Sequence, residues 1–143
     1  FFRDQVGRPK AECLAENLKR IDPSLSLVAS KARLDPDGIV ALFEGCDVIV
    51  EAFDGADQKA MIIETVLSRM RGTWLVAASG LAGYGRDASL GLHVSGRLVL
   101  CGDLESEVST DQPPMAPRVG IVANMEADAV VSILLDGGIG EKT

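Results

Sequence analysis

Aromatic residues, histidine and cysteine are all scarce in this sequence of 143 residues. Aromatic side chains make up 4% of the chain, and there is one histidine, His93. The three cysteines, Cys13, Cys46 and Cys101, are widely spaced and form no C-x-x-C pair, so the sequence predicts neither a zinc site nor a disulfide framework. This cysteine usage fits a reducing cytoplasm. No Ser–His or Cys–His pairing is evident, so nothing indicates a covalent nucleophile.

Positive charge and long apolar runs are also lacking. The chain has 14 basic against 21 acidic residues, a net charge of −7, which argues against a nucleic-acid backbone as the main partner. A nucleotide held by backbone amides remains compatible with this charge. No run of 18 apolar residues exists, so no membrane-spanning helix is predicted. Phe1 is not a natural start and no signal peptide is visible, so we expect a fragment of a longer protein or a processed one.

The stretch Asp47–Ala52 is short, apolar and rich in β-branched residues, which is typical of a buried strand in a parallel sheet. From Ala56 onward the apolar residues recur at helical spacing. Asp54 therefore lies at the carboxyl end of a strand, where the next helix starts, and open α/β sheets bind ligands at such positions. An aspartate before a helix is also an ordinary N-cap, and the position alone favours that interpretation.

Periodicity, end signals and apolar runs predict the other elements. A chain of this length, with 47% apolar residues, can form one domain with a real core. Helices alternate with strands along it, which implies βαβ crossovers, so we predict an α/β, Rossmann-like, doubly wound and mostly parallel sheet. The predicted helices cover residues 10–20, 38–44 and 56–70 and a last one from Pro117 to Gly137, and the predicted strands cover 25–32, 47–52, 74–78, 92–95 and 97–101.

The segment Gly83–Ala88 formally matches G-x-G-x-x-A, and Asp103 lies 20 residues beyond Gly83, where a ribose-binding acid is expected. That fingerprint should open a helix, however, and the β-rich stretch 92–101 follows instead. A structured loop is the favoured interpretation, with a dinucleotide site as the alternative. Ser79, Gly80 and Arg86 could border a ligand in either case.

Two cations stand near predicted helix starts. Lys10 opposes the helix dipole, so it is not placed for helix stability and could contact a phosphate together with the first amides. The alternative is an ordinary solvated lysine. Arg118 stands in the first turn of the last helix, either on the surface or in contact with an anion. His93 is interpreted as a strand residue.

Five segments then combine into a recognisable pattern: Phe2–Lys10, Cys46–Asp54, Ala78–Arg86, Val99–Asp103 and Met115–Gly120. In this order and spacing they resemble the ThiF/MoeB/HesA group of ubiquitin-activating-enzyme-like proteins. They are most similar to its short, zinc-free ThiF-like adenylyltransferases of thiamine biosynthesis. The resemblance spans residues 1 to 135, nearly the whole chain.

The resemblance implies a Rossmann-like fold, usually in a homodimer, that binds ATP and magnesium. Members adenylate the C-terminal glycine carboxylate of a small ubiquitin-like sulfur carrier, a ThiS-like protein, and release pyrophosphate. Lys10 matches the lysine that contacts the ATP phosphates. Asp54 matches the aspartate that helps to hold magnesium and the reacting phosphates. Both are thus implied to be catalytic and cofactor-binding residues.

Parts of the family pattern would precede Phe1: the Gly-rich phosphate loop G-x-G-G-x-G, the ribose-binding acid and an Asn-x-x-Arg segment. We therefore expect residues 1–143 to be the C-terminal part of a single ThiF-like domain, truncated at the N-terminus. Without the amides of the glycine loop, this chain should bind ATP weakly or not at all. Uncovered sheet edges, or the last helix, should mediate association.

Two other functions remain open at this point. One is a dinucleotide-binding oxidoreductase module that uses Gly83–Gly85 and Asp103. The other is a non-catalytic scaffold that docks a ubiquitin-like partner. No cysteine is an obvious sulfur acceptor, since Cys101 is predicted to pack inside a strand.

Overall fold

The computed structural model describes residues 1–85 and 89–140. The chain divides into two compact units, an N-terminal unit, Phe1–Leu34, and a sheet unit, Asp35–Thr143. None of the helices in the described ranges is both long and apolar enough to cross a membrane.

The N-terminal unit contains the short 3₁₀ helix η1 (Arg3–Gln5) and the helix α1 (Lys10–Ile21). The turn between them uses Gly7 at φ +86°, in the left-handed region that glycine tolerates best. The Gln5 and Asn17 amides exchange hydrogen bonds of 2.8 and 3.1 Å and so fasten η1 to α1. The predicted helix at 10–20 is confirmed, and Lys10 is its first residue.

The strand predicted for residues 25–32 is wrong. All of these residues are described, and they form neither helix nor strand. The alternation of Leu25, Leu27 and Ala29 with serines was the signal for a half-buried strand. A strand needs a neighbour for its backbone N–H and C=O groups, however, and within the described residues the four-stranded sheet forms without this segment. Leu25 and Val28 are exposed.

The described part of the sheet unit is built on a four-stranded sheet in the order β1-β2-β4-β3. The strands are β1 (Val48–Glu51), β2 (Trp74–Ala78), β3 (Gly91–Ser95) and β4 (Leu98–Gly102). β1, β2 and β4 run parallel, and β3 and β4, which correspond to the strands predicted at 92–95 and 97–101, form an antiparallel hairpin. The mostly parallel sheet is therefore confirmed, and the carboxyl ends of β1, β2 and β4 lie at one edge.

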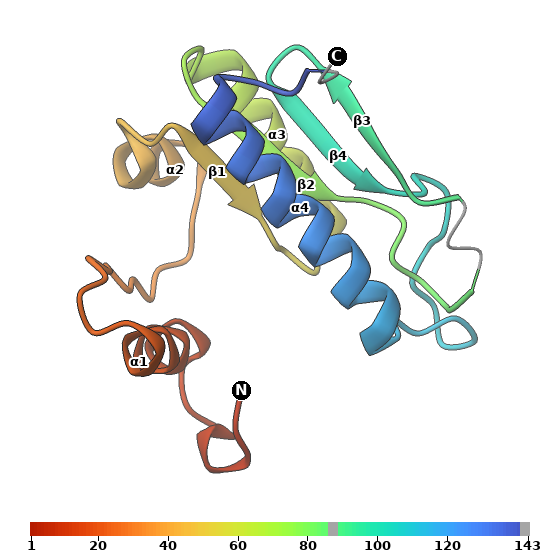
Figure 1. The fold of residues 1–143 in the computed structure, drawn as a ribbon, viewed down its shortest axis with the longest axis horizontal. Coiled ribbons are helices and arrows are strands. Elements are labelled where there is room, and N and C mark those ends of the chain that lie inside the picture. Colours follow the sequence, from red (N-terminus) through yellow and green to blue (C-terminus); the bar gives the residue numbers. More distant parts are fainter. Residues whose placement is uncertain (86–88, 141–143) are drawn as a thin grey trace. The chain divides into compact units, whose positions relative to one another are not determined.

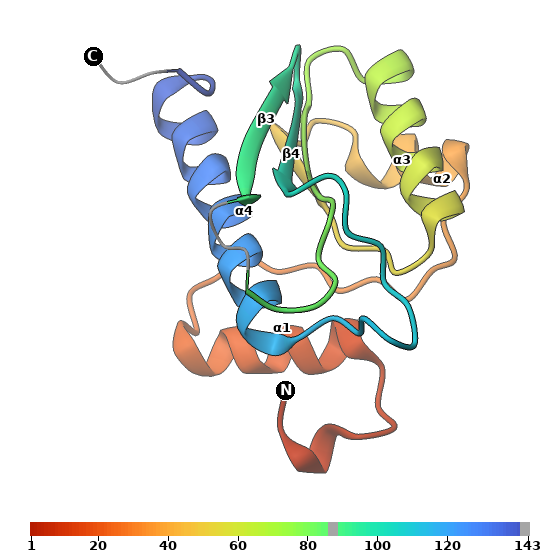
Figure 2. The same ribbon diagram turned by 90° about the vertical axis from the view of Figure 1, so that its right-hand side faces the viewer.

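Helices cover both faces of this sheet, as expected for a doubly wound fold. The helices α2 (Pro36–Phe43) and α3 (Ala56–Arg69) lie on one face, and α4 (Ala116–Asp136) crosses the other (Figure 1, Figure 2). The core on the α4 face joins strand and helix residues: Val76, Ala78, Val99, Cys101, Val122, Ala129 and Ile133. The Asp35 carboxylate caps α2 by accepting a hydrogen bond of 2.7 Å from the Gly38 N–H, and Gly137 ends α4, as predicted, at φ +80°.

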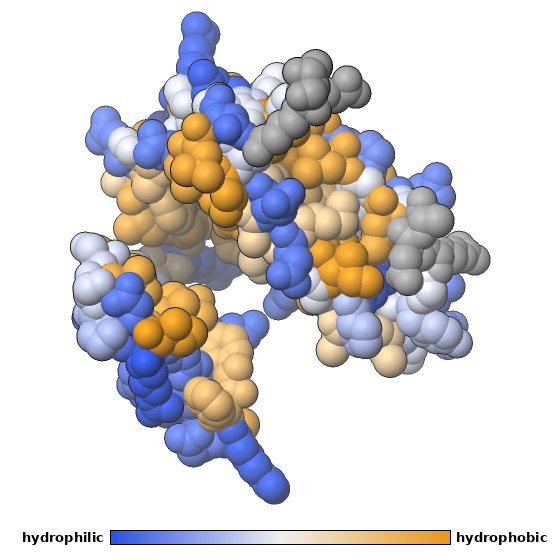
Figure 3. All heavy atoms as spheres, viewed as in Figure 1, coloured by the Kyte–Doolittle hydropathy of each residue, from blue (hydrophilic) through white to orange (hydrophobic). Residues whose placement is uncertain are grey.

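The outward face of α4 is partly apolar. Apolar side chains gather on the visible surface over its last turns (Figure 3), where Val131, Leu134 and Leu135 are exposed. The other side of α4 is packed on the sheet. The helix thus has two apolar sides, of which one forms the core.

Trp74, the single tryptophan, stands at the amino end of β2 and packs against the core as a half-buried residue. The Arg97 guanidinium carbon lies 5.5 Å from its ring centroid, a cation–π arrangement. Arg97 also donates a hydrogen bond of 3.1 Å to the Gly72 carbonyl. The hairpin turn and the segment before β2 are therefore fastened together at the amino edge of the sheet.

Candidate functional site

Asp54 lies in the turn between β1 and α3, at the carboxyl edge of the sheet, and is exposed. The N-cap of α3 is Gly55, and no side chain caps it. The interpretation of Asp54 as an ordinary N-cap is therefore wrong. Its carboxylate has no hydrogen bond or ion pair to the described residues, so its acceptor capacity is available. A free carboxylate at this edge suits a ligand or a cation.

Lys10 is exposed at the start of α1, directly after the N-cap Pro9. It belongs to the N-terminal unit, whereas Asp54 belongs to the sheet unit. That the two side chains act on one ligand remains a prediction.

A buried ion pair, not anticipated from the sequence, lies beside Asp54. Glu51 is the last residue of β1 and its side chain is fully buried. Its Oε2 accepts a hydrogen bond of 2.5 Å from Lys59 Nζ, on α3, and Lys59 Nζ also donates one of 2.8 Å to the Ala78 carbonyl at the end of β2. The available signal was an acidic residue at the end of an apolar strand, because a buried carboxylate requires a partner.

A second unexpected acid, Glu126, stands in the sheet-facing stripe of α4 between Val122 and Ala129. Its Oε1 is buried and has no hydrogen-bond partner in the described part of the chain. Burial, reinforced by the negative charge of Glu51 and opposed by Lys59, raises the pKa of Glu126 to about 7. Burial and the nearby Glu126 likewise raise the pKa of the Cys101 thiol to about 11, which is consistent with a packing role for Cys101.

Arg118 is buried, with 3% of its surface exposed, so the surface alternative is wrong and the anion contact is internal. It forms an ion pair of 2.5 Å with Asp103 and donates a hydrogen bond of 2.6 Å to the Gly85 carbonyl. Burial alone would raise the pKa of Asp103, but N–H donors of Ser106 and Glu105, the Ser106 hydroxyl and Arg118 together hold that pKa below its usual value.

This ion pair lies in the wall of a cleft of about 410 Å³ at the carboxyl ends of β2 and β4. The loops that form the cleft approach each other closely, since a Cβ added at Gly102 would overlap the Ser79 carbonyl and one at Gly80 would overlap the Asp103 carboxylate. The lining residues are Ala82, Gly83, Tyr84, Asp103, Ser106, Asp111, Gln112, Pro113, Met115 and Arg118.

The dinucleotide interpretation finds little support in this geometry. The Asp103 carboxylate, which would bind a ribose, is engaged by Arg118 and by the Ser106 and Glu105 N–H groups. Gly83 and Gly85 adopt positive φ angles in a loop, and the next element that the structure describes is the strand β3 and not a helix. Arg86 and the rest of the motif, residues 86–88, lie outside the described residues.

The other sequence candidates are scattered. His93 is an exposed residue of β3, as predicted. Cys13 and Cys101 are buried and Cys46 is exposed. Within residues 1–85 and 89–140 no three His, Cys, Asp or Glu side chains are grouped so that they could hold a metal ion by themselves.

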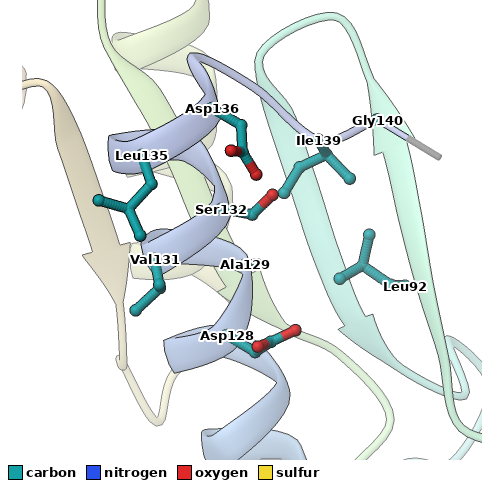
Figure 4. Close-up of a pocket in the computed structure, with 9 residues that line it drawn as sticks. All are labelled: Leu92, Asp128, Ala129, Val131, Ser132, Leu135, Asp136, Ile139 and Gly140. Carbon is teal, nitrogen blue, oxygen red and sulfur yellow. The ribbon is translucent and has the colours of Figure 1, made fainter. Parts of the chain in front are cut away.

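A separate hollow of about 300 Å³ lies between the second half of α4 and β3 (Figure 4). Its lining includes Ser132 and Asp136 on α4 and Ile139 after the end of the helix, and also Val131 and Leu135, whose side chains point away from β3. Ser132 donates a hydrogen bond of 3.1 Å to the Gly138 carbonyl and so fixes the chain after α4. Asp54 and Lys59 are not among the lining residues, so this hollow is separate from the turn that carries Asp54.

The comparison with known families agrees with this arrangement. The model of the ThiF family matches residues 1–142. The chain belongs to the ThiF family.

One curated protein is similar in sequence to this ThiF-family chain. It is 31% identical over 81 residues to the adenylyltransferase and sulfurtransferase UBA4 of Yarrowia lipolytica, an alignment that covers 57% of this chain and 20% of that protein. The chain thus spans about a fifth of the curated relative that it matches.

Solved structures with the same fold include TcdA, the tRNA N6-threonylcarbamoyladenosine dehydratase of E. coli. Its complex with AMP superposes with a TM-score of 0.79 at 16% identity and covers 95% of this chain and 68% of that one. Its complex with ATP gives a TM-score of 0.69 at 17% identity, with 96% and 70% covered. These likenesses establish the Rossmann-type fold.

Proposed function

We propose that this ThiF-family chain belongs to an ATP-dependent adenylyltransferase that activates the C-terminal carboxylate of a ubiquitin-like sulfur carrier. Family membership supports the activity, and so does the adenylyltransferase name of the relative from Yarrowia lipolytica. The AMP and ATP complexes of TcdA, which has the same fold, support a nucleotide as ligand. The observation that carries the proposal is Asp54, an accessible carboxylate that has no partner among the described residues and lies where β1 ends.

The chemistry requires positive charge. A carrier carboxylate that attacks the α-phosphate of ATP brings two anions together, and the repulsion is greatest in the transition state. Lys10 would donate hydrogen bonds to the phosphates and offset part of this charge. Asp54 would hold the cation that offsets the rest. Adenylation needs no nucleophile from the protein, so a buried Cys101 is no obstacle.

Magnesium fits the residues that are present. Mg²⁺ prefers oxygen ligands and is commonly held by one or two carboxylates together with substrate phosphates and water. Asp54 offers such a carboxylate, and the described residues contain no larger acidic cluster that would form an all-protein site. When bound, Mg²⁺ would neutralise charge on the phosphates as a Lewis acid.

The decisive experiment is the substitution Asp54→Ala in the complete gene product. We expect it to abolish carrier-dependent exchange of labelled pyrophosphate into ATP, because the cation would lose its protein ligand. Asp57→Ala, which removes another acid from the start of the same helix, should leave exchange near the wild-type rate. Full exchange by the Asp54→Ala protein would refute the role of Asp54.

The finer assignments also belong to this proposal. A ThiS-like carrier in thiamine biosynthesis and a homodimer are implied by the resemblance of the five segments to the thiamine members of the family, and a cytoplasmic location is proposed from the widely spaced cysteines. A purified ThiS-like carrier tested beside other ubiquitin-like carriers in the same exchange assay would discriminate between these pathways.

A further inference from the structure

The buried Glu51 carboxylate contacts the chain both before and after Asp54. Glu51 Oε1 accepts a hydrogen bond from the Phe53 N–H, immediately before Asp54. Glu51 Oε2 accepts the hydrogen bond from Lys59 Nζ, which stands one turn into α3. The first backbone bond of α3, from the Lys59 N–H to the Gly55 carbonyl at 3.0 Å, closes the loop behind Asp54.

Lys59 extends this network to a second strand. Its Nζ donates to the Ala78 carbonyl at the end of β2, so a single ammonium group joins β1, α3 and β2 at the carboxyl edge. Its side chain is 28% exposed, whereas that of Glu51 is fully buried. The Glu51 carboxylate is therefore compensated by Lys59 and by the Phe53 amide, and its rotamer is fixed by both.

These contacts fix the backbone on both sides of Asp54, while the Asp54 side chain itself is exposed. A carboxylate can bind Mg²⁺ together with a phosphate only if its oxygens are held in the right position, because Mg²⁺ requires a nearly ideal octahedral arrangement of its ligands. Groups that orient metal ligands commonly contribute 10–100-fold to metal affinity or activity. The Glu51 side chain is out of reach of a ligand, and the Lys59 ammonium group is directed at Glu51 and at the Ala78 carbonyl.

We propose that Glu51 and Lys59 are positioning residues, which fix the Asp54 turn so that its carboxylate meets the cation of the bound nucleotide. This inference rests on the function proposed above. It assigns to the Glu51–Lys59 pair a role beyond stability, exerted through Asp54 alone.

The test uses Glu51→Gln in the complete gene product, with and without Asp54→Ala. Glutamine retains an acceptor for the Phe53 N–H but weakens the bond to Lys59. Binding of ATP is titrated by calorimetry at several Mg²⁺ concentrations, and amide hydrogen exchange is followed over residues 52–57. We expect faster exchange in this turn and about a 10-fold higher Mg²⁺ requirement for ATP binding. In the Asp54→Ala background, Glu51→Gln should change the Mg²⁺ requirement by less than about twofold, because the effect passes through Asp54.

Three further variants separate positioning from folding. The uncharged pair Glu51→Gln with Lys59→Met avoids an unpaired buried charge, and it should fold while still raising the Mg²⁺ requirement. Lys59→Arg keeps a cation opposite Glu51 and should restore most of the wild-type Mg²⁺ response. Arg69→Met removes an exposed ion pair from the same helix and should leave that response unchanged.

The outcomes are distinct. A folded Glu51→Gln protein with wild-type exchange in the turn and a wild-type Mg²⁺ requirement would overturn the positioning role, while a loss on Asp54→Ala would still uphold the proposed function. Effects of Glu51→Gln and Asp54→Ala that simply add would overturn the positioning role as well. If Asp54→Ala itself changed neither ATP binding nor exchange of pyrophosphate, both proposals would fall.

Discussion

Glu126 is a single carboxyl group in a stripe of α4 that is otherwise packed against the sheet. An unpaired polar atom inside a protein costs free energy, so such groups are rare unless a proton, a water or a ligand satisfies them. The charged groups that face it are Glu51 from β1 and Lys59 from α3, and the Cys101 thiol of β4 lies close by. Burial and the Glu51 charge both favour the protonated form of Glu126.

This raised pKa predicts a pH-dependent stability. The folded-state pKa of Glu126, about 7, lies above the ordinary value of 4.5, so the native state binds this proton more tightly than the unfolded state does. The stabilisation is fully present below pH 4.5 and is lost as the pH rises through 7. Glu126→Gln should therefore gain stability over the wild type as the pH rises from 5 to 8, by about 2 kcal/mol after allowance for partial exposure.

Urea unfolding at each pH, followed by circular dichroism, measures this difference. Asp128→Asn removes an exposed carboxylate two positions away on α4 and should give a pH profile parallel to that of the wild type. A constant difference between Glu126→Gln and the wild type from pH 5 to 8 would contradict the assigned pKa.

Individual residues illustrate what a sequence can and cannot predict. The position of Asp54 at the end of β1 was predicted correctly. The sequence did not show that Gly55, and not Asp54, is the N-cap of α3. The partner of Arg118 comes from a loop 15 residues earlier in the chain, a distance at which no local pattern operates. Position 126 falls within the helical period of Val122 and Ala129, but the packing of α4 on the sheet decides that the carboxyl group there is buried.

At the scale of elements, the Arg118–Asp103 ion pair joins the start of α4 to the segment after β4 and to the Gly85 loop. Arg118→Met should destabilise the protein by about 3–5 kcal/mol, because it leaves the Asp103 carboxylate buried without its main cation. The matched change Arg69→Met breaks an exposed pair with Asp37 and should cost at most about 1 kcal/mol.

Chemical denaturation of both variants at neutral pH measures the two costs. If both variants lost a similar, small amount of unfolding free energy, the neighbouring N–H donors alone would be sufficient to stabilise the Asp103 carboxylate.

The helices and the parallel strands were predictable because their signals are local. Asp35 and Pro36 mark the start of α2, Gly137 marks the end of α4, and the apolar run at 74–78 coincides with β2. Residues 25–32 carried an equally clear alternation and yet form no strand, since pairing requires a neighbour that no local pattern supplies. The order β1-β2-β4-β3 is likewise a property of tertiary packing.

At the scale of the whole molecule, the two units differ in how much they bury. The buried residues of the N-terminal unit are Gln5 and Cys13, whereas the apolar core cluster belongs entirely to the sheet unit. The stretch from Ser24 to Leu34 joins α1 to the sheet unit in exposed, irregular chain. Proteases preferentially cleave exposed backbone that forms no hydrogen bonds of a helix or a sheet.

Limited trypsin digestion should therefore cut first after Lys31 or Arg33. Lys59 and Arg69 lie within the regular helix α3 and should be cut much later. Mass spectrometry of the early products identifies the first site. First cuts within α3 or α4 would show that the sheet unit opens more readily than this connecting stretch.

The location of the lone indole ring has a practical consequence for anyone who studies this protein in solution. Trp74 begins β2 under Arg97, whereas Asp54 and Lys59 gather at the far end of the parallel strands, about 13 Å along the strand direction. Its intrinsic emission will report the melting of the sheet unit and will change little when a nucleotide binds at the turn after β1. An optical assay for ligand binding thus requires a dye or an indole introduced near the turn after β1.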